Sequence, residues 1–114
     1  VIGGVVWGIS QALHEETQAD HALGRFMNHN LSEYHVPVNA DIHDVDVIFV
    51  PEEDTVVSRI GAKGVGEIGI VGVAAAISNA IHHATGKRLR STPMTPDKVM
   101  AEANPGERAT GEIA

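Results

Sequence analysis

Residues 61–86 read GAKGVGEIGIVGVAAAISNAIHHATG, a glycine-rich segment (residues 61–69) that leads into a long apolar stretch. Apolar side chains recur in that stretch every three or four residues, which predicts a helix from about Glu67 to Thr85. Gly86 follows at the position where helices commonly end in a left-handed residue. Because the apolar stripe is wide and consists mostly of small side chains, we expect this helix to be buried against close neighbours.

A second amphipathic helix is predicted near the start of the chain, over about residues 3–18. The apolar residues that set its period are Val5, Ile9 and Leu13. Three glycines, Gly3, Gly4 and Gly8, would each weaken this helix by about 1 kcal/mol relative to alanine. We therefore expect another part of the chain to pack close to the backbone there, and Trp7, on an apolar face, to belong to the core.

The remaining elements are shorter. A β-strand is predicted from Asp46 to Val50, and a weaker extended segment covers Val56 to Ile60. Thr95 is expected to cap a short helix from Pro96 to about Ala103. Residues 104–114 form a polar tail that we expect to be disordered. Together these elements predict an α+β fold with two main amphipathic helices and a few strands.

The composition limits both the size of the fold and the classes of function. The chain has 114 residues, the length of one small domain, which we expect to occupy residues 1–103. It has no cysteine, which excludes a disulfide scaffold, an iron–sulfur module, a thiol nucleophile and a Cys-type zinc site. A formal charge of −7 argues against a nucleic-acid partner. No apolar run approaches the roughly 20 residues of a membrane span, and the histidine spacings predict no metal ligand.

The glycine-rich segment is compatible with several chemistries. Gly64-x-Gly66-x-x-Gly69 matches a dinucleotide-binding fingerprint, in which backbone N–H groups hold a pyrophosphate at a helix N-terminus. The match lacks a strong preceding strand and the acidic residue expected about 20 residues later. A second interpretation is a loop that serves only helix packing. A third makes Glu67 a general base at a helix N-terminus, with Lys63 either neutralising Glu67 or facing a cofactor phosphate.

Five motifs occur in order along residues 1–100: GGVVWGISQALHEE (3–16), YHVP (34–37), GAKGVGE (61–67), AAISNA (75–80) and PMTPDK (93–98). This combination resembles the C-terminal end of the molybdopterin-binding subunit of the xanthine dehydrogenase and aldehyde oxidase family. It is most similar to the bacterial aldehyde-oxidising branch. Five motifs in the same order are far more specific than any one of them.

The resemblance implies a molybdenum hydroxylase that oxidises aldehydes or N-heterocycles with oxygen from water. The cofactor would be molybdopterin with molybdenum, in bacteria usually the cytosine dinucleotide form. Electrons would leave through 2Fe-2S and FAD groups on partner subunits or domains. Glu67 matches the family's catalytic base, and Lys63, Gly64, Val65 and Gly66 match the segment that lies against the pterin cofactor.

The resemblance also implies that the chain is part of a larger molybdopterin-binding domain. We therefore expect it to require the rest of the large subunit, and to be inactive and free of cofactor when isolated. Apolar helix stripes left exposed by the missing parts would favour self-association, so a homo-oligomer is one expected state. The expected location is the cytoplasm, with the periplasm left open.

An alternative interpretation is a non-enzymatic assembly or docking module with a glycine-rich, anion-binding loop. The two interpretations differ in what they predict for Glu67. A buried Glu67 that faces a cleft would favour the enzyme. An exposed Glu67 on a compact, self-sufficient domain would favour the docking module.

Overall fold

The computed structural model describes residues 1–101 and confirms a small α+β arrangement of helices with one two-stranded sheet. The tail predicted for residues 104–114, and the last residues of the helix predicted to reach Ala103, lie outside the described residues. In chain order the elements are α1 (Ile2–Leu13), β1 (Ala19–Asp20), β2 (Arg25–Phe26), the 3-10 helix η1 (Asn39–Asp41), α2 (Val73–Thr85) and α3 (Pro96–Ala101).

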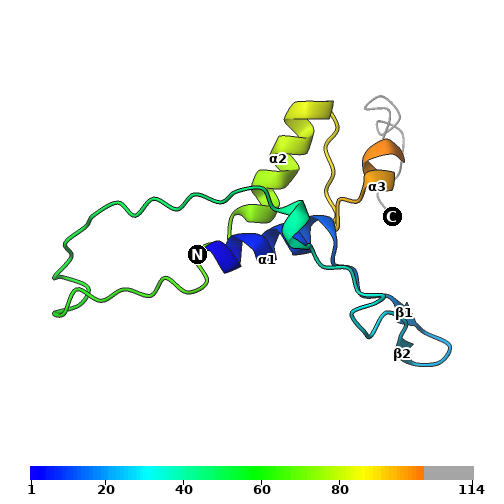
Figure 1. The fold of residues 1–114 in the computed structure, drawn as a ribbon, viewed down its shortest axis with the longest axis horizontal. Coiled ribbons are helices and arrows are strands. Elements are labelled where there is room, and N and C mark those ends of the chain that lie inside the picture. Colours follow the sequence, from blue (N-terminus) through cyan, green and yellow to red (C-terminus); the bar gives the residue numbers. More distant parts are fainter. Residues whose placement is uncertain (102–114) are drawn as a thin grey trace, which may run out of the picture.

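Helices α1 and α2 pack against each other through a glycine. A Cβ atom placed on Gly8 of α1 would lie 2.5 Å from Cβ of Val73, at the start of α2. Such a distance is impossible without movement, so only glycine allows this approach of the two backbones. The close contact predicted from the glycines of the first helix is confirmed at Gly8. Figure 1 shows α2 rising from beside α1, which runs below it.

The helix boundaries differ from the predicted ones for local reasons. Helix α1 stops at Leu13, five residues earlier than predicted, and the carbonyl of Ala12 accepts a hydrogen bond from the N–H of Met94 at 2.7 Å. Helix α2 begins at Val73 instead of Glu67, because the glycines at positions 66, 69 and 72 disfavour helix and residues 66–72 form successive turns. Its end is confirmed, since Gly86 has a φ of 75° in the left-handed region.

The hydrophobic core is small and lies around the C-terminal half of α1. Ala12, Leu89 and Met94 are the buried hydrophobic residues, at 0%, 3% and 4% exposure. The partly buried side chains packed against them are Leu13, Ala74, Ile77, Ile81 and Val99. The prediction for Trp7 is wrong: its side chain is 60% exposed, because no described segment covers that face of α1.

Residues 19–26 form a short β-hairpin. Strands β1 and β2 are antiparallel, with Ala19 opposite Phe26. The carboxylate of Asp20 accepts hydrogen bonds from the N–H groups of Ala22 and Leu23, at 2.9 and 3.1 Å, which closes the turn. A two-residue strand is too short to produce a visible sequence pattern.

A long loop, residues 42–72, separates η1 from α2 and contains no helix or strand. Figure 1 shows it extending away from the helices, on the side opposite the hairpin, and returning close to the N-terminus. The strand predicted from Asp46 to Val50 is therefore wrong, and Val56 to Ile60 forms turns instead of extended chain. A β-rich sequence forms a strand only where a neighbouring strand satisfies its N–H and C=O groups, and no described segment pairs with this one.

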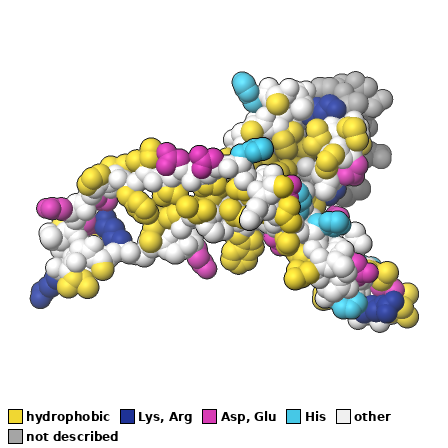
Figure 2. Space-filling view, in the orientation of Figure 1, with side chains coloured by type: hydrophobic (Ala, Val, Ile, Leu, Met, Phe, Trp, Pro, Cys, Tyr) yellow, Lys and Arg dark blue, Asp and Glu magenta, His cyan; other side chains and the backbone are white. Residues whose placement is uncertain are grey.

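The long loop leaves most of its apolar side chains exposed. The exposed members are Ile48, Phe49, Val50, Val56, Val57, Ile60, Val65, Ile68 and Val71. Figure 2 shows hydrophobic side chains along the arms of this loop as well as over the helices. Among residues 1–101, no helix combines the length and the apolar character that a membrane span requires.

Candidate functional site

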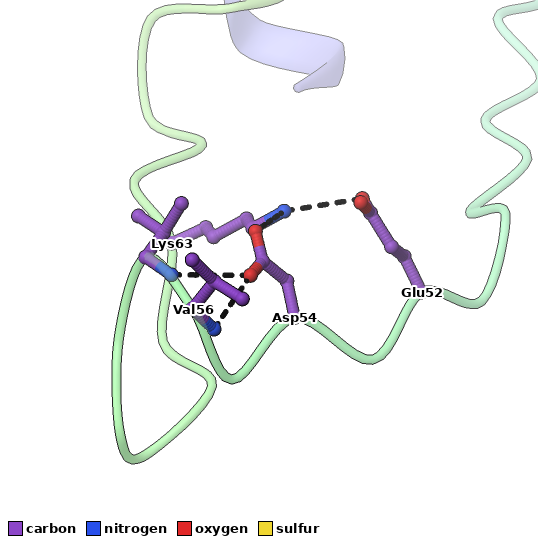
Figure 3. Close-up of polar contacts among 5 residues, drawn as sticks. Glu52, Asp54, Val56 and Lys63 are labelled. Carbon is purple, nitrogen blue, oxygen red and sulfur yellow. Dashed lines mark hydrogen bonds and ion pairs between the residues drawn. The ribbon is translucent and has the colours of Figure 1, made fainter.

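The end of the long loop farthest from the helices is held together by ion pairs. The ammonium of Lys63 lies 2.9 Å from Oδ2 of Asp54 and 3.2 Å from Oε2 of Glu52 (Figure 3). The N–H of Gly61 donates to the carbonyl of Ser58 at 3.0 Å, which closes a turn between them. The segment that contains the predicted site residues therefore begins at a turn that ion pairs and a backbone hydrogen bond stabilise.

Asp54 is the centre of this arrangement. Its Oδ1 atom accepts hydrogen bonds from the N–H groups of Val56 at 2.9 Å and Val57 at 3.1 Å. The Lys63 ammonium and then these two N–H groups hold the pKa of the Asp54 carboxyl below its usual range. Neither Asp54 nor Glu52 was identified from the sequence as a site residue. The available signal was a cluster of six acids over residues 41–54 with no lysine or arginine inside it.

Lys63 does not contact Glu67, so the interpretation in which it neutralises Glu67 is wrong in this structure. Its partners are Asp54 and Glu52, and its side chain remains 42% exposed. The alternative, that Lys63 faces a cofactor phosphate, stays a prediction. Lys63 is thus a cation held between two carboxylates at the start of the glycine-rich segment.

The backbone that follows Lys63 is open. Among residues 1–101, no acceptor is found for the N–H groups of residues 62–67. A Cβ atom on Gly64 or Gly66 would meet nothing within 4 Å. Neighbouring N–H groups without protein partners can bind an anion, because each contributes a positive partial charge and a directed donor.

Glu67 is exposed and lies six residues before α2 begins. It is therefore not at a helix N-terminus, and the predicted placement of Glu67 there is wrong. Its carbonyl accepts a hydrogen bond from the N–H of Ile70 at 3.2 Å, within the turns that lead to α2. Within the described part of the chain, its carboxylate has no hydrogen-bond or ion-pair partner.

Two of the sequence motifs meet near the end of α1. The hydroxyl of Tyr34 donates a hydrogen bond of 2.9 Å to Oε2 of Glu15. This bond, with some burial, raises the pKa of Tyr34 above its usual value. The contact connects the segment after the hairpin to the residues that directly follow α1.

An apolar cavity of about 650 Å³ opens between the end of α1, α2 and α3. None of the predicted site residues lines it. Over residues 1–101 there is also no group of three or more histidine, aspartate or glutamate side chains arranged to hold a metal ion. The residues that line the cavity are Leu13, His14, His35, Ile81, Met94, Thr95, Pro96, Val99 and Met100.

Comparisons with known proteins give a consistent result. Residues 1–43 match the family model described as a molybdopterin cofactor-binding domain. The chain is 49% identical over 100 residues to the aldehyde oxidoreductase molybdenum-binding subunit PaoC of Escherichia coli strain K12, covering 88% of this chain and 14% of that protein. It is 39% identical over 102 residues to the putative xanthine dehydrogenase molybdenum-binding subunit XdhA of the same strain, covering 90% of this chain and 13% of that protein.

A solved structure has the same fold over most of the chain. Quinoline 2-oxidoreductase from Pseudomonas putida 86 superposes with a TM-score of 0.71 and 24% sequence identity, covering 90% of this chain and 14% of that chain. The chain thus spans about one seventh of the length of the relatives it matches. From the motifs, the fold and these similarities, the chain belongs to the molybdenum-binding subunits of the xanthine dehydrogenase and aldehyde oxidase family.

Proposed function

We propose that this chain supplies part of the cofactor site and the catalytic base of a molybdenum-dependent oxidoreductase. The observation that supports this proposal is the open backbone of residues 62–67, which begins beside a lysine ammonium and ends at an unpartnered carboxylate. Anion donors and a base thus follow one another along a single exposed segment. That order matches what an enzyme needs to hold a phosphate-bearing cofactor near a reacting proton.

Lys63 and the backbone N–H groups of Gly64, Val65 and Gly66 would hold the anionic part of the cofactor. We infer molybdopterin with molybdenum, in its cytosine dinucleotide form. When bound, this group supplies the two-electron redox chemistry of the reaction. The glycines at positions 64 and 66 leave space on the backbone for a close approach, because no side chain lies within 4 Å of either position.

Glu67 would accept the proton that must leave the attacking oxygen nucleophile. A general base has to reach that proton directly, and the Glu67 carboxylate is not engaged by any other group in residues 1–101. Its place at the end of the open backbone would put it near the cofactor. The substrate class is an aldehyde or an N-heterocycle, with oxygen derived from water.

The exposed apolar side chains of the long loop support a protein partner that covers them. We infer that the rest of the large subunit covers them and encloses the cofactor, because a single open loop cannot bury a ligand of that size. Iron–sulfur and FAD groups on partner subunits or domains would receive the electrons.

The exposure of Glu67 is what the docking-module alternative predicts. That alternative also requires a compact, self-sufficient domain, and this second requirement is not met. The described residues bury only three hydrophobic side chains and leave large apolar ones exposed along the long loop. The combination favours a segment that completes a larger active site.

Substitution of Glu67 by glutamine in the assembled enzyme tests the proposal. The amide keeps the size of the side chain but cannot act as the base, so kcat should fall by at least about 10²-fold while the molybdenum content is retained. Glu53→Gln, at an exposed acid of the same loop, is the matched control and should leave kcat unchanged. Near wild-type turnover per bound molybdenum in the Glu67 variant would contradict the assignment.

A further inference from the structure

We propose that Asp54 is a positioning residue that holds Lys63 and sets the path of the glycine-rich segment. The contribution to cofactor binding rests on the function proposed above, whereas the hold on Lys63 stands independently.

The two carboxylate oxygens of Asp54 contact different partners. Oδ1 accepts the N–H groups of Val56 and Val57, which folds the chain directly after Asp54 into a turn. Oδ2 accepts from the ammonium of Lys63, nine positions later. One side chain therefore ties the start of the turn to the start of the glycine-rich segment, as Figure 3 shows.

Glu52 contacts the same ammonium but is a weaker anchor. Its distance to Lys63 is 3.2 Å against 2.9 Å for Asp54, and its side chain is 69% exposed against 19%. Glu52 also has no hydrogen bond to the backbone of the turn in the described chain. A more exposed ion pair is more screened by water and contributes less, so Asp54 should dominate.

The contact between Asp54 and Lys63 lies directly before the open backbone of residues 64–67. Lys63 immediately precedes the run of N–H groups from Gly64 to Glu67 that have no acceptor in residues 1–101. The N–H groups of this run therefore add nothing to hold its path, and only the carbonyls of Val65 and Glu67 accept hydrogen bonds, from Ile68 and Ile70. The fastening of Lys63 by Asp54 is thus the side-chain contact that defines where this run begins and where its cation points.

Limited trypsin digestion of the 114-residue chain measures this hold directly, because trypsin cleaves after Lys63 only when its side chain can leave its partners. Asp54→Asn keeps an acceptor for the turn but removes the charge, and should raise the cleavage rate after Lys63 by about two- to fivefold. Glu52→Gln should raise it less. Cleavage after Arg25, in β2, should stay the same in both variants and reports on the integrity of the rest of the fold.

One further variant and one further cleavage site separate positioning from a general loss of structure. Asp54→Glu restores the charge and should bring the cleavage rate back toward the wild-type value. Cleavage after Arg59, within the same turn, should change less than cleavage after Lys63 in Asp54→Asn. Equal rates after Lys63 in the wild type and Asp54→Asn, or no rescue by glutamate, would overturn the proposal.

The role of Asp54 in cofactor binding is tested in the assembled enzyme, by measuring the molybdenum content that remains after dialysis. If Asp54 positions Lys63 for an anionic cofactor, Asp54→Asn and Lys63→Ala should both lose molybdenum faster than Glu52→Gln does. Faster cleavage after Lys63 in Asp54→Asn would support the hold of Asp54 on Lys63. Unchanged molybdenum retention in both Asp54→Asn and Lys63→Ala would contradict the cofactor role of Lys63. The two failures are therefore distinguishable.

Discussion

Glycine serves the helix pair of α1 and α2 and the long loop in different ways. In the helix pair, Gly8 lies so close to Val73 that a Cβ atom would be 2.5 Å from the neighbouring side chain. In the long loop, Gly64 and Gly66 have nothing within 4 Å of a Cβ position. The first glycine permits close packing, whereas the other two leave backbone groups accessible. A glycine-rich sequence therefore has to be interpreted together with what lies beside it.

The two regions also differ in where their apolar side chains go. Leu89 packs into the small core beside the helix pair, at 3% exposure. Ile60 in the long loop is 87% exposed. Stability should therefore depend on the helix pair and its core, and contacts with other parts of a larger protein should depend on the long loop.

The largest effect is expected from a truncation in the core. Leu89→Ala should destabilise the chain by about 2–5 kcal/mol, because it removes buried methyl groups and leaves a cavity. The matched truncation in the long loop, Ile60→Ala, should change stability by less than about 0.5 kcal/mol. Urea unfolding followed by circular dichroism measures both. Equal losses for the two variants would show that the long loop carries its own core.

A smaller effect with opposite signs is expected from two glycines of α1. Gly8→Ala forces a methyl group against Val73 and should destabilise the chain by about 1–3 kcal/mol through overpacking. Gly3→Ala meets nothing within 4 Å and should stabilise it by up to about 1 kcal/mol through helix propensity. The same unfolding measurement applies. Stabilisation by both substitutions would contradict the close helix contact.

Self-association is expected to depend on the long loop more than on the helix stripes. Phe49 is 71% exposed, so Phe49→Ser should weaken association of the isolated chain by about tenfold. Ile77→Ser on α2, whose side chain is partly buried against the core, should instead lower stability. Sedimentation equilibrium of the wild type and both variants distinguishes these effects. A wild type that is monomeric at high concentration would refute the prediction.

The smallest effect concerns pH and the tip of the long loop. Lys63→Met removes the largest contribution to the lowered pKa of Asp54, so that pKa should rise toward its usual value, with the two backbone N–H groups keeping part of the shift. Because the folded-state pKa lies below the unfolded one, the contacts of Asp54 stabilise the loop above the usual pKa. They are lost as the pH falls through the lowered pKa.

Carbon-13 NMR of the Asp54 carboxyl measures this titration. Asp97 is the internal control, because its pKa is lowered mainly by the hydroxyl of Thr95, far along the chain from Lys63. Its titration should be identical in the wild type and in Lys63→Met. An unchanged Asp54 titration in the variant would show that Lys63 is not its partner in solution.

Sequence reasoning succeeded where structure depends on neighbours three or four positions apart. It predicted both main helices, the left-handed Gly86 and the family, since helix periods and short motifs are local properties of the chain. It failed for the strand at Asp46 to Val50, because a strand depends on a partner that no local pattern specifies.

The candidate site shows the same division. The sequence by itself determined that Lys63, two glycines and Glu67 follow one another in a glycine-rich segment, and that acids gather before it. Only the tertiary structure decided that Lys63 pairs with Asp54 and Glu52 instead of Glu67, and that Glu67 lies outside α2. The physical reason is that an ion pair depends on the path of the chain in space. The turn after Asp54 sets that path by bringing residues nine positions apart within 2.9 Å.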